Sequence, residues 1–218
     1  MIDSPQEAKN SMKAVLVIVR STFQDIWADL WTMLACNLIW LLANVLVIPG
    51  PPATFALVYY ADRLAHDEVA DLGDFWKAFL SYWGPAWRWG IVNLVVIFFL
   101  VMDVSLTGQN IQGGWAPYLQ GLYLVLLAVW MILQFFSLPF LFEQEKMSIR
   151  QAWRNGMVAI SANPGFTLLI ISALCLILFT GTILFLLSLM FGAVFAACLS
   201  SRSVLNRLEL TRQSIAAK

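Results

Sequence analysis

Hydrophobic residues along the chain fall in long blocks separated by short polar segments. Few charges interrupt the apolar runs, which occupy about residues 28–48, 53–61, 86–104, 117–142 and 165–200. A helix needs about 20 apolar residues to cross a hydrocarbon core about 30 Å thick. The last run is about twice that length and is interrupted at Thr180-Gly181-Thr182, so it predicts two helices. The run at 53–61 is too short to cross by itself.

The stretch VIPGPPATFAL, residues 47–57, decides how that short run is interpreted. It contains Pro49, Gly50, Pro51 and Pro52. These residues either kink one long helix or form a turn between two helices. Proline suits the first turn of a helix, where its missing N–H leaves no intrahelical bond unmade. We therefore predict a turn, followed by a short helix from Pro52 to about residue 63 or 66.

The basic residues support this topology. The 13 lysines and arginines cluster before the first span, after the short helix, after residue 142 and after the last span, and segment 105–116 has none. Cytoplasmic loops are enriched in such residues. An external turn at residues 49–52 places all of them on one side. The prediction is an all-α membrane bundle of six transmembrane helices with both termini in the cytoplasm. The alternative is five spans, with residues 52–66 as a re-entrant helix.

The ends of the chain lie outside this bundle. Between residues 11 and 27 apolar side chains recur every three or four positions, which predicts an amphipathic helix in the membrane interface. We accordingly divide the chain into an N-terminal cytoplasmic or interfacial segment (1–27), one transmembrane domain (28–201) and a cytoplasmic tail (202–218).

Two cytoplasmic segments, about 71–83 and 148–160, also predict amphipathic helices. Asp71 is placed to cap the first, and Ser148 with Gln151 forms a capping-box pattern for the second. They are candidate docking helices for a partner, and the alternative is that they only anchor the chain to lipid headgroups. The candidate residues are Phe75, Trp76, Lys77, Trp83, Arg150, Trp153 and Arg154.

Uncharged polar residues within the predicted spans form a second candidate set, a polar intramembrane face. They are Asn37, Asn44, Asn93 and Gln134. Such groups could line a substrate cavity, but we favour the alternative that they form hydrogen bonds between helices. No charged residue lies near the centre of a span, which argues against an ion-coupled transporter.

Composition excludes several classes of function. The chain is 61% hydrophobic and 12% charged, with zero net charge. It lacks the excess of basic residues that nucleic-acid-binding proteins carry. The 3 cysteines lie in apolar runs without metal-ligand spacing, and the single histidine, His66, stands in an acidic loop. No catalytic motif is present. We expect neither an enzyme nor a cofactor or metal.

Several stretches together resemble the YesL family of bacterial membrane proteins. They are ACNLIWLLANVLVIPGPPATFALVYYADRL, DFWKAFLSYWGPAW, SLPFLF and AWRNGMVAISANPG. The doubled proline Pro51-Pro52 departs from the family pattern. No activity is established for that family. The resemblance implies a multi-pass protein of the bacterial cytoplasmic membrane, encoded beside carbohydrate uptake systems of the ABC type.

The function expected from these observations is that of a non-enzymatic accessory or interaction subunit of a bacterial cytoplasmic-membrane complex, and the resemblance implies a link to carbohydrate ABC-type uptake. Its partners would be the lipid bilayer and other membrane subunits, with no nucleic acid. Two alternatives stay open at this stage: a small transporter or channel for an uncharged solute, and a structural subunit of a larger energy-transducing complex.

Overall fold

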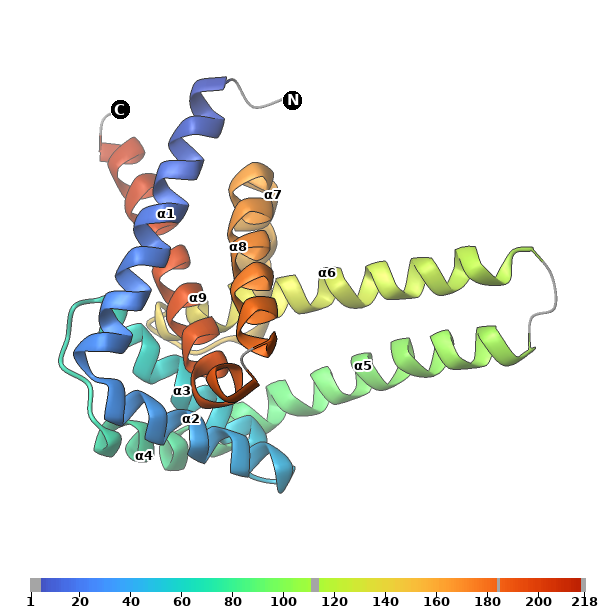
Figure 1. The fold of residues 1–218 in the computed structure, drawn as a ribbon, viewed down its shortest axis with the longest axis horizontal. Helices are drawn as coiled ribbons and strands as arrows, with labels where there is room; N and C mark the ends of the chain where they lie inside the picture. Colours follow the sequence, from blue (N-terminus) through green and yellow to red (C-terminus); the bar gives the residue numbers. More distant parts are fainter. Residues whose placement is uncertain (1–4, 111–113, 184, 217–218) are drawn as a thin grey trace.

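The computed structural model describes residues 5–110, 114–183 and 185–216, which form nine helices and no strand (Figure 1). The all-α prediction is confirmed over these residues. The helices are α1 (Pro5–Ala28), α2 (Leu30–Val45), α3 (Gly50–Ala65), α4 (Leu72–Ser81), α5 (Trp83–Asn110), α6 (Ala116–Phe142), α7 (Ile149–Ala162), α8 (Pro164–Ile183) and α9 (Phe185–Ala216).

The proline-rich stretch is a turn between two helices, as predicted. Val47 has a positive φ of 64°, which reverses the chain after α2. Helix α3 then begins at Gly50, earlier than the predicted start at Pro52, because Pro51 fits the first helical turn. A Cβ on Gly50 would lie 3.0 Å from the Oδ1 atom of Asn44, so glycine lets the two helices meet closely without displacing that side chain.

The short helix α3 is the centre of the bundle. Its small and aromatic side chains are almost all inaccessible, including Ala53, Phe55, Ala56 and Tyr60, each at 0% exposure. Small residues allow helix backbones to approach closely inside a membrane. With 16 residues α3 is only about 24 Å long, so its burial by neighbouring helices compensates for its short reach.

Helices α5 and α6 form a long hairpin that extends away from the rest of the protein (Figure 1). They contain 28 and 27 residues, so each is about 40 Å long. Their bases pack on α3, α7 and α9. Toward the tip the two helices pack only on each other among the described elements, and their outer faces are exposed.

The number of membrane crossings is only partly decided by helix length. Helices α5, α6 and α8 are long and apolar enough to cross, and α1 with α2 would make a fourth crossing but is bent by 97°. The predicted helix at 11–27 is present within α1, whereas its placement at the membrane surface stays a prediction. The six predicted spans correspond to α2, α3, α5, α6, α8 and α9, and their crossing likewise stays a prediction.

Another predicted helix boundary moves. The apolar run 165–200 is indeed two helices, but residues 180–182 are helical and α8 continues to Ile183. Thr180 remains in the helix because its hydroxyl donates to the carbonyl of Leu176 at 2.8 Å. Helix α9 runs without a break into the segment from residue 202 onward, whose assignment as a cytoplasmic tail stays a prediction.

Candidate functional site

The end of α3 that is predicted to face the cytoplasm carries a network of charged side chains. Arg63 donates to Glu68 at 3.0 Å and lies 2.7 Å from Asp74 at the start of α4. Arg202 on α9 binds both carboxylate oxygens of Asp25 on α1, at 2.7 and 2.8 Å. These ion pairs join three further helices around the end of α3.

A second cluster lies beside this network and contains the only histidine. Asp62 and His66 follow one another by one helical turn at the end of α3, and Glu143 comes directly after α6. The Nε2 atom of His66 is 3.2 Å from Oε1 of Glu143. The Nδ1 atom lies 2.9 Å from the backbone carbonyl of Asp62, which orients the ring.

The hydrogen bond to the Asp62 carbonyl and the surrounding carboxylates raise the pKa of His66. This environment favours the protonated ring, which pairs with Glu143 and holds α3 against α6.

The same three side chains form the metal-ligating group found in the described part of the chain. Each offers one ligand atom, and these atoms all lie within 4.8 Å of one another. Imidazole and carboxylate are ligands for divalent cations such as Zn²⁺. The sequence places His66 in an acidic loop and does not indicate that Glu143 lies beside it.

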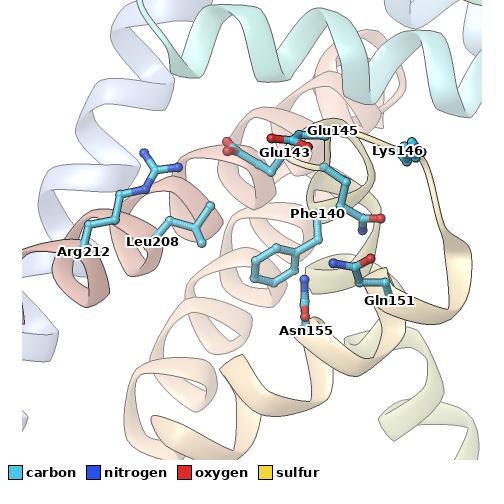
Figure 2. A pocket seen from close by; sticks show the side chains of 9 residues that line it. Phe140, Glu143, Glu145, Lys146, Gln151, Asn155, Leu208 and Arg212 are labelled. Carbon is cyan, nitrogen blue, oxygen red and sulfur yellow. The ribbon is translucent and has the colours of Figure 1, made fainter. Parts of the chain in front are cut away.

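The cluster borders a polar pocket of about 500 Å³ between the α6–α7 connection and helices α7 and α9 (Figure 2). Glu143 belongs both to the cluster and to the pocket wall, so the cluster is accessible from this side. In Figure 2 the acidic side chains Glu143 and Glu145 lie between Arg212 on one side and Lys146 on the other. The lining therefore carries both signs of charge and does not select an ion of one sign.

The predicted docking helices are present as α4 and α7. The first begins with a reciprocal capping box, in which the Asp71 side chain accepts from the Asp74 N–H at 2.8 Å. The predicted box at α7 is only half made. Ser148 accepts from the N–H of Gln151 at 3.4 Å, but its own N–H donates to the side chain of Gln144 instead. Gln144 takes that position because it precedes the cap in the α6–α7 connection.

Among the predicted docking residues, the structure separates exposed from buried ones. Phe75 is 0% exposed and Trp153 donates to Gln134 at 3.2 Å, so both face the bundle. A helical spacing identifies an apolar face without showing what covers it, so the docking role of the two helices stays a prediction. The exposed members are Trp76, Lys77, Trp83, Arg150 and Arg154.

The predicted polar face does not form one surface. Asn37 is buried, and its Oδ1 accepts the N–H groups of Ala193 and Val194 in α9, at 3.0 and 3.1 Å. Asn44 is exposed and donates to the carbonyl of Trp40 in its own helix at 2.8 Å. The two asparagines were expected to share a face, but their amides have separate surroundings because only Asn37 meets α9.

Asn93 and Gln134, by contrast, lie close together within the α5–α6 hairpin, where indole groups bind both amides. The Nε1 atoms of Trp89 and Trp153 donate to Oε1 of Gln134, at 2.8 and 3.2 Å. Trp130 donates to Oδ1 of Asn93 at 3.0 Å. These bonds join α5, α6 and α7. Asn93 and Gln134 therefore form hydrogen bonds between helices, as polar residues inside spans often do.

Comparison with known proteins gives one match. The family described as "Protein of unknown function, DUF624" matches residues 33–104. The matched segment runs from α2 to α5 and includes the proline-rich turn and the amphipathic helix α4. No curated protein and no solved structure matches the chain. Over residues 33–104, this multi-pass helical membrane protein is therefore similar to a family whose function is unknown.

Proposed function

We propose that this protein is a non-enzymatic accessory subunit that binds another membrane protein through the α5–α6 hairpin. The observation that carries the proposal is the isolation of that hairpin. Spans of a multi-pass protein normally bury much of their surface against one another. Here the two longest apolar helices leave the bundle together and keep their outer faces exposed.

Polar groups hold the hairpin together along its length. Trp89 binds Gln134 at the base, Trp130 binds Asn93 further along, and Gln120 donates to the carbonyl of Val104 nearer the tip, at 3.1 Å. These bonds turn the polar side chains toward the interior of the hairpin, and its exposed surface is mostly apolar. A stiff apolar pair of helices suits packing against the spans of a partner.

The outer face of α5 also carries a shallow apolar groove of about 500 Å³. It is lined by Leu94, Ile97, Phe98, Val101, Met102 and Ser105. All of these residues belong to α5, so no other described helix covers the groove. The groove offers a partner helix a surface into which side chains can pack.

The first partner to test is the one that the YesL resemblance suggests, a carbohydrate importer of the ABC type in the bacterial cytoplasmic membrane. The solute-transporter alternative receives less support, because the four predicted polar residues do not line a common cavity.

The test is co-purification from native membranes in a gentle detergent, with the bound proteins quantified. We expect one membrane protein in a stoichiometric amount, and we expect the combined variant Phe98→Ala/Met102→Ala to lose it. The control variant Leu168→Ala changes an exposed apolar residue of α8 (66% exposed) and should retain the partner. Equal recovery with both variants, or recovery of the chain alone, would contradict the proposal.

A further inference from the structure

Two arginines of α9 use the same pair of donor atoms differently. Arg202 donates from Nε and Nη2 to the two carboxylate oxygens of Asp25. This side-on fork is the arrangement in which a guanidinium binds a carboxylate or a phosphate through two parallel bonds. The Nε and Nη2 atoms of Arg207 are buried and have no hydrogen-bond partner among the described residues. One fork is satisfied within the chain, and the other is not.

The guanidinium of Arg207 is held in a defined orientation. Its Cζ atom lies 3.5 Å from the centre of the Phe166 ring, and Phe166 is itself only 2% exposed. Stacking on an aromatic ring occupies the face of a guanidinium and leaves its in-plane N–H groups available. Arg207 is therefore oriented to bind, although its fork has no partner.

A cavity of about 480 Å³ adjoins this arginine, between the ends of α1, α8 and α9. Its polar lining consists of Asn10, Ser11, Asn163, Asn206 and Arg207. None of the described residues that line it is acidic. Since an arginine stays charged at physiological pH, the lining carries a positive charge without a counter-charge.

The start of α8 adds to this positive character. The helix begins at Pro164, directly after the cavity residue Asn163, and contains 20 residues. The first N–H groups of a helix have no partner within it, and the helix dipole makes this end positive. Anions bind readily at such ends.

We propose that this cavity binds a phosphate group, carried by a phospholipid headgroup or present as free phosphate, with Nε and Nη2 of Arg207 as its two donors. The cavity lies on the side predicted to face the cytoplasm, where anionic lipids are abundant and basic pockets between helices bind their headgroups. Nε and Nη2 are covered, so a neighbouring side chain must move aside when phosphate binds. A buried donor without a partner is unfavourable, and the hydrogen bonds gained on binding offset the cost of this movement.

The test measures thermal unfolding of the full-length protein, purified in a neutral detergent, with three additives. These are phosphatidylglycerol, a neutral glycosyl diacylglycerol without phosphate, and inorganic phosphate. We expect phosphatidylglycerol to raise the unfolding temperature and the glycolipid to leave it unchanged. Stabilisation by inorganic phosphate as well would identify free phosphate as a ligand, whereas its absence would assign the site to the lipid.

The variants assign the effect to the fork. In Arg207→Gln the apparent dissociation constant for phosphatidylglycerol should rise about ten- to a hundredfold, because two charge-assisted hydrogen bonds are lost. Arg20→Gln, which changes an exposed arginine of α1, should bind like the wild type. If Arg207→Gln does not fold, Arg207→Lys keeps the charge without the fork and should still weaken binding. Equal binding by the wild type and the folded Arg207 variant, or no response of the wild type to either phosphate compound, would overturn the proposal.

Discussion

Replacement of Asn37 by leucine tests how α2 is joined to α9. The Asn37 side chain is 2% exposed, and its Oδ1 accepts two backbone N–H groups of α9, at 3.0 and 3.1 Å. Leucine has the same number and branching of side-chain heavy atoms, although its methyl groups are bulkier, so the substitution removes the acceptor without leaving a cavity. The loss therefore contains the two hydrogen bonds and a contribution from tighter packing.

The expected loss follows from two bounds. A buried donor that loses its partner costs about 1–3 kcal/mol, whereas measured bonds between membrane helices average about 0.6 kcal/mol. The substitution removes one acceptor from two backbone donors. We therefore expect Asn37→Leu to lower the free energy of unfolding by about 1–3 kcal/mol. The assay is a titration with sodium dodecyl sulfate in mixed micelles, followed by far-ultraviolet circular dichroism.

Asn44→Leu is the matched control. It makes the same substitution on the same helix, but the Asn44 amide is exposed and bonds only within α2 among the contacts described. Its loss should stay below about 0.5 kcal/mol. Equal losses in the two variants would refute the structural role assigned to Asn37.

Two further predictions concern helix packing and the charge network. Gly156→Ala should destabilise by about 1–3 kcal/mol in the same titration because its Cβ would meet Ser137 on α6, whereas Gly121→Ala, with nothing within 4 Å, should be neutral or stabilising. Arg202→Gln should lower the free energy of unfolding by about 2 kcal/mol. In a double-mutant cycle, adding Asp25→Asn should recover part of that loss, whereas additive losses would argue against the ion pair between Arg202 and Asp25.

Local sequence signals predicted the helices well. The length of each apolar run, the prolines before α3 and the aspartate before α4 act on neighbouring residues, so their effect can be read along the chain. The turn before α3 is the clearest example, since Pro51 suits the first turn of the helix that follows it. The boundaries that moved, at Gly50 and Ile183, did so because glycine and threonine were compatible with helix at those positions.

Contacts between distant segments could not be predicted in the same way. Nothing near His66 in the sequence indicates Glu143, which approaches it only because α6 ends beside α3. Phe75 has the spacing of an amphipathic face, but its burial depends on the position of α4 against α3. Two features of the sequence were compatible with the cluster of His66 and Glu143. His66 stands in an acidic loop, and Glu143 directly follows an apolar helix.

A photo-crosslinking amino acid on the α5–α6 hairpin, introduced in native membranes, tests directly whether the hairpin binds a partner protein. At position 98, which is 60% exposed on α5, we expect one discrete protein adduct, identified by mass spectrometry. At position 168 on α8, which is 66% exposed, we expect adducts with lipid alone. Lipid adducts alone at position 98 would show that the hairpin faces the bilayer and would contradict its role as a partner-binding surface.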